Sequence, residues 1–378
     1  MWFVKKFIFV HGTEIRFFVI PLPLNLNGMA KNETVTLMDI VRRTGLSKGT
    51  VDRVLHNRGE VSRKSYDKVM RAAEELGYKP NVYASLLASP RRIVIAVLLP
   101  YQAPDSFWAL SASGIDRARE SVEGLGGTIV KVEYDQYSMD SFREACGRLV
   151  EMEPSGVVIA PLFKHETSLL AEELRAKEIP YVYIDSKPDD DGYLAYFGMP
   201  MYDSGYLCAD QLTGGQDVGS ALVIRIRRDK LRQSDPTVNR RAGFLDYLAE
   251  HVPACTVHSV FIDPNEPERI DGTLDGFFAD HPEVRDIAMF NSRIHLIVPW
   301  LEAHPRPGRR VVGFDNLAAN VAALRRGTVS ALIAQHPDEQ VRLAIDALAD
   351  TLLLKKAPAR RDNFMHMDIL TRYNVEYY

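Results

Sequence analysis

Polar and aromatic side chains follow several apolar runs of this sequence, in positions where they could bind a hydroxyl-rich molecule. Asp185 and Asn291 each come at the end of such a run, and the pair Phe107 and Trp108 comes soon after another. Carboxylates and amides exchange hydrogen bonds with hydroxyl groups, and an aromatic ring packs against the apolar face of a sugar. These residue types therefore favour the binding of a polyol.

Signatures of catalysis do not accompany these residues. The sequence has no phosphate-binding glycine loop, no dinucleotide-binding glycine motif after an apolar run, no nucleophile elbow and no zinc-protease histidine pair. The cysteines Cys146, Cys208 and Cys255 are far apart, which predicts free thiols in a reducing compartment. We therefore expect a binding protein without catalytic residues, cofactor or metal site. An enzyme on a similar fold is the weaker alternative.

Two successive series of apolar runs and amphipathic stretches must position these side chains. Runs rich in Val and Ile are typical of buried parallel strands, and the amphipathic stretches between them are typical of helices. The predicted strands are Ile93–Leu99, Thr128–Val132, Gly156–Ala160, Tyr181–Ile184, Ala221–Ile226, Thr256–Ile262, Asp286–Phe290 and Arg310–Phe314. The predicted helices cover approximately residues 107–124, 140–151, 165–177, 236–250, 267–280, 293–303 and 316–326. Two such series predict an α/β fold with two doubly wound lobes over residues 93–378, and a ligand site between the lobes at the carboxyl ends of the strands.

The charge of the chain is unevenly distributed. The whole chain has a net charge of −4, yet residues 29–92 contain 13 Lys and Arg against 7 Asp and Glu. The remainder is therefore acidic. A basic segment on an acidic body indicates a DNA-binding module joined to a domain that does not bind DNA.

The first 28 residues contain apolar runs interrupted by charged residues and prolines. No run is long enough to span a bilayer, and no clear signal-peptide cleavage site follows. We therefore predict that residues 1–34 are an N-terminal extension, either disordered or preceding a true start at Met29. The protein is expected in the cytoplasm, without membrane contact.

The basic segment has the pattern of three short helices. Thr36 is the expected cap of the first helix, Ser47 caps a second that runs to about His56, and a third runs from Ser62 to Leu76. The outer face of the second helix carries Lys48, Gly49, Thr50, Asp52 and Arg53. Two short helices joined by a glycine-containing turn, the second basic on its outer face, are typical of a helix-turn-helix, which we predict over residues 35–80.

Residues 35–89, from the run VTLMDIVRRTGLSKGTVDRVL to YASLLAS, resemble without gaps the headpiece of the LacI/GalR family of bacterial regulators. The resemblance implies a sequence-specific DNA-binding transcription regulator, expected to be a repressor. It also implies that residues 81–92 form a hinge helix and linker, with Asn81 as the cap. Leu87 falls on the leucine that paired hinge helices wedge into the minor groove, which kinks the DNA.

The resemblance also assigns roles within the headpiece. Arg53 falls on a base-reading arginine, because a guanidinium can bind a guanine edge with two hydrogen bonds, although a phosphate contact is the alternative. Candidates for phosphate or capping contacts are Thr36, Ser47, Thr50, Asn57 and Ser62. The pair Lys48 and Gly49 and the carboxylate Asp52 depart from the usual family residues, so the operator sequence is left open.

The resemblance extends over the rest of the chain, and to the periplasmic sugar-binding proteins that share the two-lobed fold. Residues 239–244 match the family pattern R-x-x-G-[FW], which puts Arg240 in a ligand role, and residues 312–316 match G-[FY]-D, which does the same for Asp315. The whole implied ligand set is Asp105, Phe107, Trp108, Asp185, Arg240, Asn291, Asp315 and Gln335. Each residue taken singly could instead be a hydrogen-bonded strand-end group, or a core residue in the case of one aromatic.

Together these observations predict a homodimer that binds pseudo-palindromic double-stranded operator DNA under the control of a small ligand. A sugar or sugar derivative is the favoured ligand, and purine-like compounds stay open. The sequence does not distinguish an inducer from a corepressor. The alternative function is a solute-binding protein of the same fold without a role at DNA.

Overall fold

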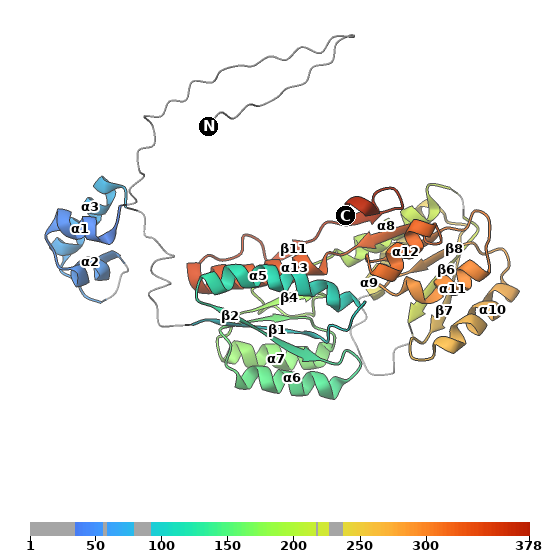
Figure 1. The fold of residues 1–378 in the computed structure, drawn as a ribbon, viewed down its shortest axis with the longest axis horizontal. Helices are drawn as coiled ribbons and strands as arrows, with labels where there is room; N and C mark the ends of the chain where they lie inside the picture. Colours follow the sequence, from blue (N-terminus) through green and yellow to red (C-terminus); the bar gives the residue numbers. More distant parts are fainter. Residues whose placement is uncertain (1–34, 56–58, 79–91, 217, 227–236) are drawn as a thin grey trace, which may run out of the picture. The chain divides into compact units, whose positions relative to one another are not determined.

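The chain divides into two units, Met1–Asn81 and Val82–Tyr378, in the computed structural model (Figure 1). Each unit has an apolar core of its own. The structure describes residues 35–55, 59–78, 92–216, 218–226 and 237–378. The predicted N-terminal extension over residues 1–34 and the predicted hinge helix lie outside the described residues. Each unit is described by itself below.

The N-terminal unit contains the three predicted helices, α1 (Leu37–Thr44), α2 (Lys48–Leu55) and α3 (Arg63–Leu76). Ile40, Val51 and Val69 are fully buried where the three helices meet. Helices α1 and α3 end at glycines, Gly45 and Gly77, that both have φ of 66°. A side chain would disfavour this left-handed conformation, so glycine lets each helix end and the chain turn back into the bundle.

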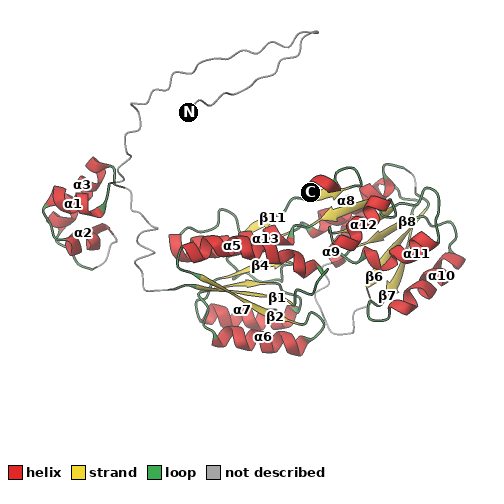
Figure 2. Cartoon of the chain, in the orientation of Figure 1, coloured by secondary structure: helices red, strands yellow, loops and turns green. Residues whose placement is uncertain are grey.

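The first lobe of the larger unit is a parallel sheet covered by helices on both faces (Figures 1 and 2). Its strands, in spatial order, are β11 (Asp362–Phe364), β5 (Ala195–Gly198), β4 (Tyr181–Asp185), β3 (Gly156–Ile159), β1 (Val94–Pro100) and β2 (Thr128–Tyr134). Helices α6 (Met139–Glu151) and α7 (Lys164–Ala176) cover one face, and α5 (Ser111–Gly124) and α13 (Pro337–Leu354) cover the other. The short 3-10 helix η1 (Phe107–Leu110) leads into α5.

The second lobe repeats the arrangement, with one antiparallel strand at its edge. Its strands, in spatial order, are β12 (Asp368–Leu370), β10 (Ala331–Ala334), β9 (Val311–Phe314), β8 (Asp286–Met289), β6 (Ser220–Ile226) and β7 (Thr256–Ile262). Its helices are α8 (Met201–Thr213), α9 (Thr237–His251), α10 (Ile270–Asp280), α11 (Val298–Ala303) and α12 (Ala318–Arg326), with 3-10 turns η2 (Pro267–Arg269), η3 (Ile294–Ile297) and η4 (Val375–Tyr377). Among the residues described, no helix has the length and apolarity needed to cross a membrane.

The predicted two-lobed α/β fold is therefore confirmed, but the sequence left several elements unassigned. Every predicted strand is present, with its ends shifted by at most two residues. Three of the predicted helices begin with a 3-10 turn, and those over 267–280 and 293–303 are η2 with α10 and η3 with α11. Elements β5, α8, β10, α13, β11 and β12 were not predicted.

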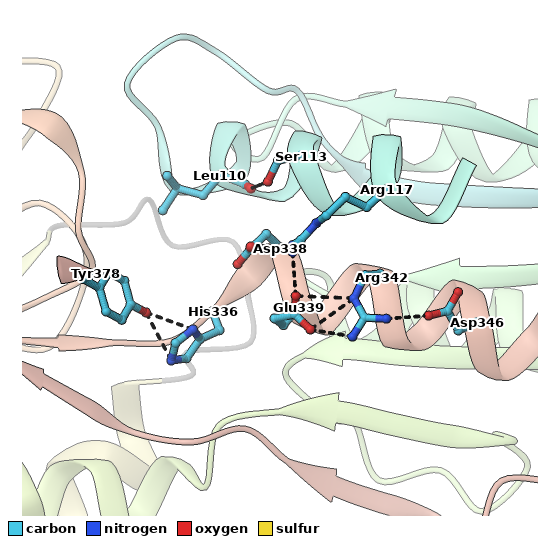
Figure 3. Close-up of polar contacts among 9 residues, drawn as sticks. All are labelled: Leu110, Ser113, Arg117, His336, Asp338, Glu339, Arg342, Asp346 and Tyr378. Atoms are coloured by element: carbon cyan, nitrogen blue, oxygen red, sulfur yellow. Dashed lines mark hydrogen bonds and ion pairs between the residues drawn. The ribbon is translucent and has the colours of Figure 1, made fainter. Parts of the chain in front are cut away.

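The chain passes between the lobes three times, through residues 199–200, 335–336 and 365–367, which we call the crossing segments. As a result α13 follows the strands of the second lobe in sequence but packs in the core of the first, where Val341 and Leu348 are fully buried. In the second crossing segment the imidazole of His336 hydrogen-bonds the Tyr378 hydroxyl, 2.9 Å from Nδ1 (Figure 3). Three connections give the lobes a defined hinge.

Helix α5 lies unusually close to α13 because Gly114 has no side chain. A Cβ atom at this position would stand 1.9 Å from the backbone oxygen of Asp338. Beside this contact, the guanidinium of Arg117 binds the carboxylates of Asp338 at 2.6 Å and Glu339 at 2.9 Å (Figure 3). These ion pairs are half exposed and add little stability by themselves, so the close packing at the glycine is the stronger constraint.

We predict that Gly114→Ala destabilises the larger unit by about 1–3 kcal/mol, because the added methyl group must push the two helices apart. Gly147→Ala is the matched control, since Gly147 lies on the exposed side of α6 with no atom near the position of an added Cβ. That change should stabilise the helix by about 0.5–1 kcal/mol. Urea unfolding followed by circular dichroism measures both, and equal effects of the two substitutions would contradict the packing argument.

Candidate functional site

A cavity of about 280 Å³ lies between the two lobes of the larger unit, at the carboxyl ends of their strands. The structure brings all the predicted ligand residues to its wall. These are Asp105, Phe107, Trp108, Asp185, Arg240, Asn291, Asp315 and Gln335. Their placement agrees with the expectation for a doubly wound fold, while their roles as ligand contacts stay predictions.

The guanidinium of Arg240, on α9, is buried and fully surrounded by partners. Its Nε donates to Ser204 Oγ at 2.8 Å, Nη1 donates to the backbone oxygen of Phe290 at 2.6 Å, and Nη2 donates to Gln335 Oε1 at 2.8 Å. The guanidinium also lies over the Phe314 ring, 3.9 Å from its centroid. Because a buried cation is costly without such partners, these contacts fix its position at the cavity wall.

Gln335 connects this arginine to a buried carboxylate. Its Nε2 donates to Asp315 Oδ2 at 2.8 Å, so the two charged groups are joined through one amide rather than directly. Burial raises the pKa of Asp315 to about 7, although the hydrogen bond from Gln335 and the charge of Arg240 act in the opposite direction. The other oxygen, Asp315 Oδ1, is buried and has no hydrogen-bond partner among the described residues. The cavity wall therefore contains an acceptor that a ligand hydroxyl can satisfy.

Three of the aspartates stand in a strained backbone conformation. Asp105, Asp185 and Asp315 have φ of 56°, 64° and 66°, in the left-handed region that side chains disfavour. The Asp185 peptide is held by Gln340 of α13, whose Oε1 accepts from Asp185 N–H at 2.9 Å and whose Nε2 donates to the Gln335 backbone oxygen at 2.8 Å. This glutamine thus ties the strand end of the first lobe to the second crossing segment.

The two residues of the predicted aromatic pair differ in how deeply they are buried. The Phe107 and Trp108 rings meet edge to face, with centroids 5.0 Å apart. Trp108 is only 4% exposed and belongs to the core of the first lobe, whereas Phe107 is half-buried. The open alternative of a core aromatic therefore describes Trp108, and Phe107 is the ring with more surface available for stacking.

Two cavity residues that the sequence did not indicate make a contact between the lobes. Arg293, after β8, donates a hydrogen bond from Nη2 to the hydroxyl of Tyr137, after β2. Both side chains line the cavity. Their position just beyond strand ends is the only sequence signal that could have found them. Further lining residues that were missed include Gln136, Leu162, Met201, Ser292 and His295.

In the N-terminal unit, α2 presents the predicted DNA-contacting residues on one face. Lys48, Gly49 and Arg53 are exposed, and Thr50 and Asp52 are half-buried. The opposite face of α2 contributes Val51 and Val54 to the core. Within the described residues of this unit, the outer face of α2 is therefore uncovered.

Three predicted polar residues act at the beginnings of helices. Ser47 Oγ accepts from Thr50 N–H at 3.1 Å, and Ser62 Oγ accepts from Ser65 N–H at 3.3 Å. The hydroxyl and the backbone N–H of Thr36 both donate to one Asp39 oxygen, at 2.6 and 2.8 Å. The capping interpretation of these residues thus has a structural basis. The predicted contacts Asn57, Asn81 and Leu87 lie outside the described residues.

The raised pKa of Asp315 predicts a pH-dependent stability. Because the protonated form is favoured in the folded state, the stabilisation is complete below the unfolded value near 4 and is lost as the pH rises through about 7. The loss should be about 4 kcal/mol at most. We expect Asp315→Asn to remove this component, so the difference in unfolding free energy between the variant and the native chain should grow from pH 4 to pH 8. Parallel pH profiles for the two chains would contradict this.

Comparison with known proteins connects both units to described families. Residues 36–81 match the family model described as bacterial regulatory proteins, lacI family. Residues 95–356, more than half of the chain, match the model of a periplasmic binding protein domain. The first match includes α2 with its candidate DNA contacts, and the second includes all the residues predicted to contact the ligand.

Three relatives illustrate the range of the resemblance. The HTH-type transcriptional regulator DegA of Bacillus subtilis is 26% identical over 50% of this chain, and the match spans about half (51%) of DegA. The ribose operon repressor of Halalkalibacterium halodurans is 25% identical over 75% of this chain and 80% of its own length. A solved structure from Bacteroides fragilis, proposed to be a LacI transcriptional regulator, is 32% identical, has a TM-score of 0.72, and covers 76% of this chain and 100% of its own. The chain therefore belongs to the lacI family of bacterial regulatory proteins, with a periplasmic binding protein domain as its larger unit.

Proposed function

We propose that this chain is a transcription regulator, acting as a repressor, whose N-terminal unit binds operator DNA and whose larger unit binds a small ligand. The observation that carries this proposal is the presence in one chain of a helix-turn-helix and a polar cavity between two lobes. A solute-binding protein needs only the second feature. The relatives named above are regulators, which also favours a binding function over catalysis.

The exposed face of α2 supports the DNA-binding part of the proposal. Lys48 and Arg53 project from a short helix that fits the major groove of B-DNA. Ser47 and Ser62, at the starts of α2 and α3, are exposed, and a helix N-terminus favours phosphate groups. We infer that two copies of the chain bind the two halves of a pseudo-palindromic operator as a homodimer.

The chemistry of the cavity supports a sugar or sugar derivative as the ligand. Asp315 Oδ1 offers an acceptor that has no partner among the described residues, the Asn291 amide offers an N–H donor, and Phe107 offers an aromatic surface. A volume of about 280 Å³ lies near the lower limit for ligand pockets, which suits a monosaccharide. The name of the Halalkalibacterium halodurans relative, a ribose operon repressor, points to the same class.

Movement of the lobes about the crossing segments is the proposed route from ligand to DNA. The Tyr137–Arg293 contact closes one side of the cavity with residues from both lobes. A ligand that binds the closed arrangement more tightly than an open one shifts the population toward closure. The shift changes the geometry at residue 92, where the linker from the headpiece enters the first lobe, and thereby changes the affinity for operator DNA.

Arg53→Ala should weaken operator binding by about 1–3 kcal/mol and relax specificity at one base pair, because it removes a donor pair to a base edge. Arg71→Ala is the control, since Arg71 is an exposed arginine on α3 rather than on α2. Fluorescence anisotropy with the operator and with single-base variants measures both. An equal loss on every DNA sequence would show that Arg53 contacts phosphate only.

A thermal-shift screen tests the ligand class, using pentoses, hexoses, sugar acids, sugar phosphates and nucleobases as probes. We expect a concentration-dependent increase in Tm with a sugar, and loss of that increase in Asp315→Asn, which has nearly the same shape but no carboxylate. Asp346→Asn is the control, because Asp346 binds Arg342 on α13 and does not line the cavity (Figure 3). An increase only with nucleobases, or one that survives Asp315→Asn, would contradict the proposal.

A further inference from the structure

Two histidines and a glutamate gather in the second lobe, away from the ligand cavity. His258 lies on β7, and His281 and Glu283 follow the end of α10. One ligand atom from each residue lies within 4.8 Å of the other two, and His281 Nδ1 is 3.6 Å from Glu283 Oε1. The imidazole centroids are 4.1 Å apart. Nothing in the proposed regulator function uses these groups.

The surrounding structure orients both imidazoles. The Phe277 ring packs against them, with centroids 5.6 Å from His258 and 4.8 Å from His281. The backbone N–H of His281 donates to the Phe277 oxygen at 2.9 Å, which ends α10, and Pro282 restricts the next turn toward Glu283. The three side chains are therefore placed by a helix end and a strand, as the ligands of a fixed metal site are.

The donor set selects a class of metal ion. Two imidazole nitrogens and one carboxylate oxygen suit Zn²⁺ and related ions such as Co²⁺ and Ni²⁺, whereas Mg²⁺ and Ca²⁺ prefer oxygen ligands alone. Zinc bonds of about 2.0–2.2 Å place tetrahedral ligands roughly 3.4 Å apart. The His281–Glu283 distance is already close to this separation, and the His258 ligand atom, within 4.8 Å of the other two, needs a movement of at most about 1.4 Å.

An ion can reach these residues from solvent. His258 and Glu283 line an open cavity of about 590 Å³ together with Thr256 and Asp286, the first residues of β7 and β8. This is the amino-terminal edge of the second sheet, whereas the ligand cavity lies at its carboxyl-terminal edge. The two sites are therefore separate.

We propose that His258, His281 and Glu283 bind one divalent ion of the zinc class, with a fourth position open to water. The ion links the end of α10 to the edge strand β7, which run alongside each other (Figure 1). The sequence predicted no metal site, because no two of these ligands have the paired-histidine or paired-cysteine spacing on which that prediction rested. The proposal does not depend on the identity of the sugar or the operator.

The test uses the full chain, stripped of metal with a chelator, and titrated with Zn²⁺ by calorimetry and with Co²⁺ by visible absorption. We expect one equivalent of Zn²⁺ to bind, a Co²⁺ spectrum with the d–d bands of a four- or five-coordinate ion, and an increase in Tm. Mg²⁺ should produce none of these changes. Both His281→Ala and Glu283→Gln should lose the one-equivalent binding event.

His366→Ala is the matched control, because His366 is an exposed histidine outside the cluster. It should bind zinc as the native chain does. Circular dichroism of each variant separates lost ligation from lost folding, and Glu283→Gln keeps the shape of the side chain if His281→Ala fails to fold. Zinc binding that survives both cluster variants, or no binding by the native chain at 100-fold molar excess, would overturn the proposal.

Discussion

The buried guanidinium of Arg240 is the constraint around which the carboxyl edge of the second lobe is built. A cation without water needs a partner for each of its donors, and here the partners come from α8, from the end of β8 and from the end of β10. The Phe314 ring of β9 supports its flat face. One side chain thus contacts the ends of β8, β9 and β10 and helix α8, and fixes their relative positions. Removing any partner leaves a buried charge partly unpaired, which is far more costly than losing an exposed ion pair.

The same constraint determines what the cavity offers to a ligand. Because Gln335 stands between Arg240 and Asp315, the carboxylate is not neutralised by a direct ion pair, and burial keeps its pKa high. One oxygen is left without a partner among the described residues. A hydroxyl group that donates to it stabilises the charged form, so ligand binding should release a proton near neutral pH. The protein therefore positions the polar groups of the cavity, and a ligand hydroxyl supplies the partner that Asp315 Oδ1 lacks among the described residues.

The sequence predicted those features that local patterns encode. Buried parallel strands are continuous apolar runs, so eight of them were recognisable, and the short patterns around Arg240 and Asp315 located the cavity wall. Elements whose place depends on distant partners were missed: α13 belongs to the first lobe only because it packs against α5 and β4. Tyr137 and Arg293 meet through the relative position of the two lobes, and His258 and His281 meet through the packing of α10 on β7. No periodicity in the chain encodes these contacts.

The three crossing segments determine the order in which the two lobes are completed during translation. The sheet of the first lobe begins with β1, yet it lacks α13 and its edge strand β11 until residues 337–364 have been translated. The second lobe, apart from its edge strand β12, is synthesised as one uninterrupted stretch from α8 to β10. The lobe that is translated first is thus completed after the body of the lobe that is translated second. Until then the face of the first sheet that α13 covers lacks that helix, so apolar residues that are buried in the finished protein stay exposed and prone to aggregation.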